Sequence, residues 1–134
     1  MDIDELADTF ELLGDWEERY AYLIDLGRKL PPLAAAERRE ETKVRGCMSQ
    51  VWLVGGPQPD GRMQFNGDSD SSLVKGLIAL LLLMVNGRTP AEVRALDIAA
   101  QFQRLGLESN ITVNRRNGFF AMVERIRALT ATPG

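Results

Sequence analysis

The sequence contains no histidine and a single cysteine, Cys47. Without histidine, the chain cannot form the Ser-His or Cys-His pair that activates the nucleophile of the usual hydrolases. One cysteine and no histidine also exclude a structural zinc site or a cysteine-ligated cluster held by this chain alone. A single cysteine cannot form an internal disulfide, so the fold does not depend on an oxidising compartment.

Long apolar segments and a basic surplus are also lacking. The longest apolar run, Leu77 to Val85, has nine residues, whereas a membrane-spanning helix needs about 20. The first residues, MDIDELADTFEL, are acidic and amphipathic and do not resemble a signal peptide. The formal net charge of −3 argues against nucleic acid as the main partner, because phosphate binding needs a basic surface. The sequence therefore predicts a cytoplasmic protein that binds neither membrane nor nucleic acid.

Charge is unevenly distributed along the chain. The first 18 residues hold eight acidic side chains and no basic one, whereas the last 20 hold four arginines and one acid. Two interpretations remain open: solvated helix faces, or a docking surface for a charged partner.

The length of 134 residues predicts one domain, residues 1–134, with one core. Apolar residues recur at helical spacing through most of the chain, and capping residues mark where each helix begins. Two helices are predicted to begin at Ile3 and at Asp15, and a short helix or turn is predicted from Ala34 to Glu41. A long apolar helix is predicted between the cap candidates Asp68-Ser69-Asp70 and the terminating pair Asn86-Gly87. Three more helices are predicted to begin at Thr89, Asp97 and Asn114. The segment Asn66-Asp68-Asp70 also resembles the start of a calcium loop, but Ser71 replaces the required glycine and Leu77 the required glutamate. Helix capping is therefore the better interpretation of these side chains.

Two short stretches change to a period of two, which is typical of strands. Val51 and Leu53 alternate with Trp52 and Val54, and a second alternating run follows at 62–66. The turn formers GGPQPDG separate the two runs and predict a β-hairpin. A third short strand is predicted at 42–45, which would put Gly46 and Cys47 at a tight turn. The predicted fold class is α+β, with a small three-stranded antiparallel sheet packed against several helices.

Cys47 admits two interpretations from its neighbours alone. Most free cysteines are small buried hydrophobes. A reactive role is favoured by the turn former Gly46, by the cations Lys43 and Arg45, which favour the thiolate, and by Ser49, which can donate to the sulfur. A thiolate needs no general base when the atom it attacks is itself sulfur. Such a chain suits sulfur acceptance, in which the sulfur waits on Cys47 as a persulfide until another protein takes it.

Three segments together resemble the SufE family, which includes the CsdE-like acceptors. These segments are KVRGCMSQVWL, GDSDSSLVKGLIALLL and ITVNRRNGFFAMVERIR, and the resemblance extends back to TFELLGDWEERYAYLIDLGRKLPPL. It implies the α+β fold shared with IscU-type scaffolds. It also implies a sulfur acceptor and activator that is not a stand-alone enzyme. The expected partners are a SufS-like cysteine desulfurase and a SufBCD-like scaffold. Pyridoxal phosphate belongs to the desulfurase, and this chain is expected to bind no cofactor or metal.

The resemblance also suggests roles for individual residues. The family's sulfur-accepting cysteine falls on Cys47, and its loop aspartate falls on Asp70, which is expected to restrain the cysteine loop and to cap a helix. Arg115 falls on an arginine that opens the last helix near the partner-facing surface, although this chain reads TVNRRNG where TPSRxxG is expected. The remaining expected site residues are Arg45, for partner binding, and Gly46, Ser49 and Gln50, for positioning the loop.

Two other functions compete with sulfur acceptance. One is a stand-alone cysteine enzyme, such as a one-cysteine peroxidase or thiol transferase, which would act on a small substrate without a partner. The other is an interaction module in which Cys47 is inert. The sequence leaves open whether the protein is a monomer or a homodimer, and which desulfurase and final acceptor it serves.

Overall fold

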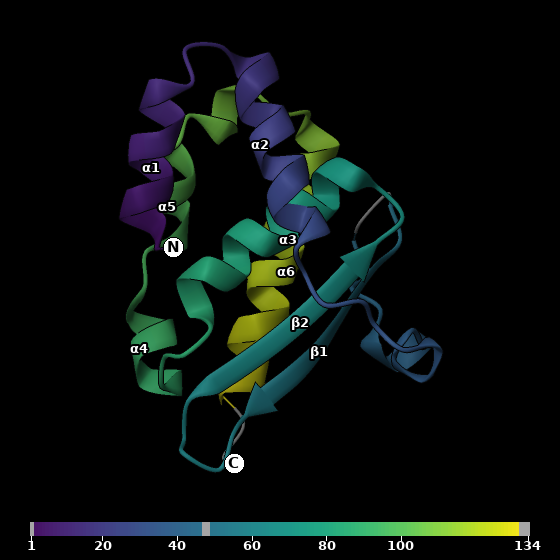
Figure 1. Ribbon diagram of the computed structural model, residues 1–134. Coiled ribbons are helices and arrows are strands. Elements are labelled where there is room, and N and C mark those ends of the chain that lie inside the picture. The colour runs from purple at the N-terminus through teal and green to yellow at the C-terminus, as the bar shows by residue number, and fades with distance from the viewer. Residues whose placement is uncertain (1, 47–48, 132–134) are drawn as a thin grey trace.

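The computed structural model describes residues 2–46 and 49–131. The other helices surround the central helix α3 (Ser72–Val85), and a two-stranded sheet lies along one side of it (Figure 1). The elements are α1 (Ile3–Leu12), α2 (Trp16–Arg28), the 3-10 turns η1 (Ala35–Glu37) and η2 (Glu40–Thr42), β1 (Val51–Pro57), β2 (Met63–Ser69), α3 (Ser72–Val85), α4 (Pro90–Ala95), α5 (Ile98–Arg104), the 3-10 turn η3 (Leu107–Ser109) and α6 (Val113–Ala131). No helix of the described ranges is both long and apolar enough to cross a bilayer.

The helix starts follow from side chains that accept otherwise unpaired backbone N–H groups. The Asp15 carboxylate accepts the Glu18 N–H at 2.9 Å, and the Asp97 carboxylate accepts the Ala100 N–H at 3.0 Å. Thr89 forms a full capping box, with the proline at the first helical position. These three predicted starts are confirmed.

Two predicted caps are wrong. Asp68 and Ser69 belong to β2, so α3 begins later, and the Ser71 hydroxyl accepts the Val74 N–H at 3.4 Å. Helix α6 begins at Val113 and therefore contains Asn114. The hydroxyl of Thr112, the residue before the helix, accepts the Arg115 N–H at 3.3 Å. Serine and threonine compete well with aspartate and asparagine as caps, so the sequence did not rank them correctly.

The hairpin is confirmed, and its strands are longer than predicted. β1 and β2 pair antiparallel from Val51 opposite Ser69 to Pro57 opposite Met63, so the glycines at 55 and 56 belong to β1. Alternation places the buried apolar side chains of both strands on the face that contacts α3, and leaves Trp52 on the other face.

The expected third strand is wrong in its extent. In residues 2–46 and 49–131 the sheet has two strands, and the 42–45 segment contributes one antiparallel bridge, Lys43 to Trp52. The Val44 N–H donates to the Val51 carbonyl at 2.8 Å. The pairing stops there because η2 ends at Thr42 on one side and a turn begins at Arg45 on the other. The predicted α+β class is confirmed.

The apolar run predicted as a buried helix is α3, and ten of its residues are buried. It packs against α2 on one side and against the sheet on another (Figure 1). The helices α2 and α3 approach closely where Gly27 faces Gly76, since a Cβ built on Gly27 would lie 2.7 Å from the Gly76 nitrogen. This packing fixes the position of the first turn of α3, which borders the candidate site.

Candidate functional site

The candidate site is the segment that joins η2 to β1. Cys47 lies outside the described residues, as does Met48, and the residues on either side of them are described. Before them, Arg45 and Gly46 form a turn, and Gly46 has a φ of +88°, a left-handed conformation that favours glycine. A Cβ built on Gly46 would lie 3.6 Å from the Cβ of Ala121, so this arm of the segment passes over α6.

After the cysteine, Gln50 and Asp70 exchange two hydrogen bonds. The Gln50 N–H donates to the Asp70 carboxylate at 3.1 Å, and the Asp70 N–H donates to the Gln50 carbonyl at 3.3 Å. These bonds tie the second arm of the cysteine segment to the residue that follows β2. The structure thus brings Asp70 and Gln50 together beside the cysteine, while the restraining role expected of Asp70 stays a prediction.

Replacing Asp70 with alanine should loosen this second arm. The substitution removes the acceptor of the Gln50 N–H, which costs about 1 kcal/mol for a hydrogen bond at an exposed residue. We expect a fall in melting temperature of a few degrees and an increase of several-fold in the rate at which iodoacetamide alkylates Cys47. Asp70→Asn retains an acceptor oxygen and serves as the control. An unchanged alkylation rate in Asp70→Ala would show that the pair does not restrain the segment.

A pocket of about 290 Å³ opens beside Ser49. Apolar and polar residues both contribute to its lining, which is formed by Ser49, Val51, Val74, Leu77, Thr112, Asn114, Arg115, Gly118 and Phe119. Ser49 and Arg115, which the sequence proposed for different roles, thus line the same pocket. The Arg115 side chain comes from the first turn of α6, so the helix start sets its position.

Arg45 does not join this group. It is exposed and its guanidinium contacts the Glu40 carboxylate at 3.1 Å, with both side chains mostly solvated. An exposed ion pair of this kind contributes little to stability. The structure therefore places Arg45 on the surface before the cysteine, in a pair that a partner can displace at low cost.

The sequence did not single out the buried carboxylate of Asp68 for the site. Its side chain is 8% exposed and contacts two cations, the guanidinium of Arg38 and the ammonium of Lys75 at 3.4 Å. The carboxylate oxygen that faces Lys75 also accepts the Ser69 N–H at 2.8 Å. The alternating pattern of the second strand could have identified this residue. If the strand is extended from residue 66 to Ser69, Asp68 lies opposite Trp52 on the outer face of the sheet.

The environment of Asp68 predicts acid sensitivity. Burial raises the pKa of this carboxyl, but the Ser69 N–H, Lys75 and Arg38 together outweigh burial and hold the pKa below its ordinary value. A carboxyl with a lowered pKa stabilises the fold above the unfolded-state pKa of about 3.9, and this stabilisation is lost as the pH falls through the folded-state pKa. Urea unfolding at a series of pH values from 6 downwards should therefore show a steeper acid loss for the wild type than for Asp68→Asn. Parallel curves would contradict this assignment.

The described residues contain no group of three or more metal-ligating side chains suited to a metal ion. The side chains that resembled a calcium loop bind separate partners. Asn66 donates to the Pro31 carbonyl at 2.8 Å, Asp68 pairs with its two cations, and Asp70 accepts from Gln50. Because each side chain binds a different partner, the three do not converge on one point as the ligands of a calcium loop would.

Residues 4–130 match the model of the SufE family, described as an Fe–S metabolism associated domain. A SufE-like protein of Rhizobium etli is 45% identical over 93% of this chain and 86% of its own length. A SufE-like protein of Rhizobium meliloti is 38% identical over 94% of this chain and 92% of its own length.

The fold is also found among solved structures. The solution structure of a hypothetical protein from Thermus thermophilus superimposes with a TM-score of 0.75 and covers 98% of this chain and 96% of that protein. At 22% identity, this likeness concerns the fold alone. The match over residues 4–130, together with the two relatives, shows that the chain belongs to the SufE family and has a role in Fe–S metabolism.

Proposed function

We propose that this protein is a sulfur carrier that takes sulfane sulfur from a cysteine desulfurase onto Cys47 and delivers it to a cluster scaffold. The observation that carries the proposal is membership of the SufE family in a chain whose single cysteine falls in the KVRGCMSQVW segment. The partners are a desulfurase of the SufS type, which holds the pyridoxal phosphate, and a scaffold of the SufBCD type. In this proposal the protein also stimulates the desulfurase, because it removes the sulfur that would otherwise block the enzyme's cysteine.

The chemistry is a thiol–persulfide exchange. The Cys47 thiolate attacks the outer sulfur of the desulfurase persulfide, so one S–S bond forms and the bond to the enzyme's sulfur breaks. The enzyme's cysteine leaves as a thiolate and the outer sulfur remains on Cys47 as a persulfide. One S–S bond replaces another, so no external oxidant or reductant is needed. The absence of histidine is no obstacle, because a thiolate needs no general base for this attack.

Neighbouring residues supply the surroundings for such a persulfide. Ser49, two residues after Cys47, lines a pocket together with apolar residues such as Val74 and Phe119. If the persulfide enters this pocket, the apolar lining limits access of cytosolic reductants and oxidants, which consume exposed sulfur species. Arg115 lines the same pocket and is proposed to face the partner.

The test is the intact mass of the protein after incubation with an active cysteine desulfurase, pyridoxal phosphate and L-cysteine. We expect a gain of one sulfur atom that is removed by a thiol reductant and is absent when Cys47 has first been alkylated. Omitting L-cysteine gives the matched control. An unmodified mass, with a desulfurase shown to bind the protein and to turn over, would identify a docking protein with an inert cysteine. Consumption of peroxide by the protein alone would support a stand-alone cysteine enzyme.

A further inference from the structure

Asp68 is the only charged residue that is buried in the described ranges, at 6% exposed. It lies where three backbone segments run side by side, because Trp52 pairs with Asp68 in the hairpin and forms the bridge to Lys43. Buried charges are costly unless they are paired, and removing one partner of such a pair is strongly destabilising. A carboxylate at this position therefore holds together the elements that supply its cations.

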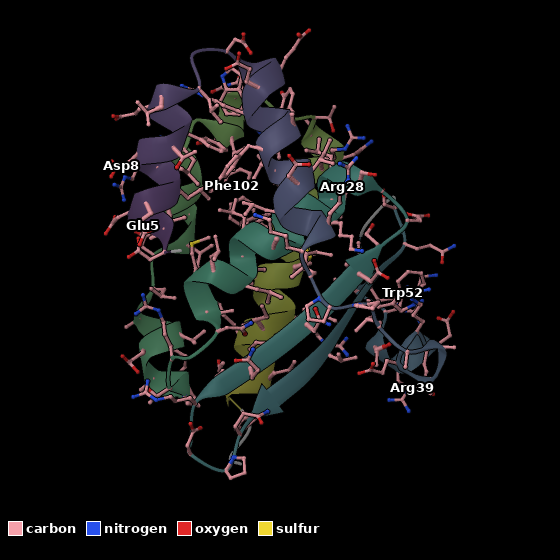
Figure 2. The ribbon with its side chains drawn as sticks, viewed as in Figure 1. Glu5, Asp8, Arg28, Arg39, Trp52 and Phe102 are labelled. Atoms are coloured by element: carbon pink, nitrogen blue, oxygen red, sulfur yellow. The ribbon has the colours of Figure 1, made fainter. Side chains whose placement is uncertain are left out.

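The two cations come from separate elements. Arg38 immediately follows η1, in the segment that leads to Cys47, and its guanidinium also lies 5.8 Å from the centre of the Trp52 ring. Figure 2 shows Trp52 beside the segment that carries Arg39. Lys75 comes from the first turn of α3. Asp68 thus connects the segment before the cysteine, the hairpin and the helix that follows.

Both arms of the cysteine segment start next to this junction. The first arm begins at Val44, whose N–H donates to the carbonyl of Val51, the residue before Trp52 in β1. The second arm returns where Gln50 exchanges two hydrogen bonds with Asp70, two residues beyond Asp68. The distance between the two arms is therefore set by the strand pair that Asp68 occupies and by the segments that its cations hold in place.

We propose that Asp68 is a positioning residue for sulfur transfer. Through its ion pairs with Arg38 and Lys75, it holds in place the two arms that flank Cys47. This inference rests on the function proposed above. A sulfur exchange needs the attacking thiolate in line with the S–S bond, and a misplacement of about 1 Å can cost about 100-fold in rate. Asp68 acts on the geometry of this attack without touching the reacting atoms.

The variants are Asp68→Asn, which keeps the shape and an acceptor for the Ser69 N–H, and Arg38→Gln, whose partly exposed side chain makes misfolding less of a concern. Arg38→Lys is the conservative rescue, since it retains a cation. The matched control is Asp4→Asn, which removes the exposed pair with Arg104. Asp4 lies in α1, whose Glu5 and Asp8 are on the opposite side of the molecule from Trp52 (Figure 2).

Two measurements are made on each full-length variant. The first is the rate of sulfur gain on Cys47 as a function of desulfurase concentration. The second is amide hydrogen exchange, which needs no desulfurase and compares Val44 and Gln50 with Leu80 in the centre of α3. For Asp68→Asn we expect a maximal rate reduced about tenfold, on the scale set by attack geometry, and a half-saturating desulfurase concentration within about twofold of wild type. In Asp68→Asn, the amides of Val44 and Gln50 should lose protection from exchange, whereas the Leu80 amide should retain it. Arg38→Gln should show a smaller effect of the same kind. Arg38→Lys and Asp4→Asn should match the wild type.

Four outcomes would overturn the inference. A uniform loss of protection that includes Leu80 would make Asp68 a residue of general stability. Local loss of protection with an unchanged maximal rate would show that the arms need no fixed spacing. If the wild type itself gains no sulfur, the proposed function fails and this inference fails with it. A wild type that gains sulfur at the same rate as Asp68→Asn removes the inference alone.

Discussion

Replacing Cys47 with serine is expected to abolish sulfur acceptance. A serine hydroxyl does not ionise near neutral pH and cannot form a stable bond to sulfane sulfur, so neither the attack nor the persulfide is available to the variant. The chain holds no second cysteine that could substitute. Intact mass after incubation with the desulfurase should show no added sulfur, and L-cysteine turnover by the desulfurase should fall to its rate without the protein.

Docking of this variant should survive. Serine differs from cysteine by one atom, and substitutions that leave surrounding contacts in place change free energies by about 0.5 kcal/mol or less, which is about twofold in Kd. Calorimetric titration of the variant into the desulfurase measures this directly. A matched control carries Cys47→Ser together with Ala91→Cys, which offers an exposed thiol on α4. That thiol should not restore stimulation, because it lies outside the cysteine segment. Full stimulation by Cys47→Ser would remove the covalent step from the proposal.

Local signals in the sequence predicted local structure well. The caps at Asp15, Thr89 and Asp97 and the alternation of Val51 and Leu53 each depend on residues within a few positions of one another, and the structure has them as predicted. The turn at Gly46 likewise follows from a residue type that tolerates a positive φ. At these positions the deciding residues lie within a few positions of one another, and the sequence sufficed.

Contacts between distant residues were not predictable in this way. The pair of Arg38 with Asp68 joins residues 30 positions apart, and it depends on where the segment that carries Arg38 lies relative to Trp52 and the hairpin. Likewise, the 42–45 segment makes one bridge where a third strand was expected, because η2 ends at Thr42 and a turn begins at Arg45. Neither periodicity nor capping rules describe where a turn-rich segment lies against a sheet, so both features required the structure.

The candidate site was predicted in part, and from two kinds of signal. The chemistry of the lone cysteine followed from the absence of histidine, whereas the interest of Asp70 and Arg115 came from the family resemblance alone. The structure adds contacts that the resemblance does not contain, namely the two bonds between Asp70 and Gln50 and the place of Arg115 in the pocket with Ser49. It separates Arg45 from that pocket by pairing it with Glu40.

Gly76→Ala is expected to cause a large loss of stability, because α2 and α3 meet there without space for a side chain. A Cβ on Gly76 would lie 2.6 Å from the carbonyl carbon of Leu23, a backbone atom that cannot rotate away. The alanine would gain about 1 kcal/mol of helix propensity, but the helices must separate to accommodate it. Overpacking of this kind costs about 1–3 kcal/mol and occasionally more. Contact with the Leu23 backbone puts this site at the upper end.

The expected net loss of about 3 kcal/mol corresponds to a fall in melting temperature of about 10 °C for a chain of this size. Thermal and urea unfolding of Gly76→Ala measure the loss, and Gly14→Ala is the matched control because nothing lies within 4 Å of its added Cβ. Gly14→Ala should change stability by less than about 1 kcal/mol. Unchanged stability in Gly76→Ala would mean that α2 and α3 can move apart at little cost. That result would weaken the argument for Asp68 as well, since Lys75 precedes Gly76 and is held beside Asp68 by the same helix packing.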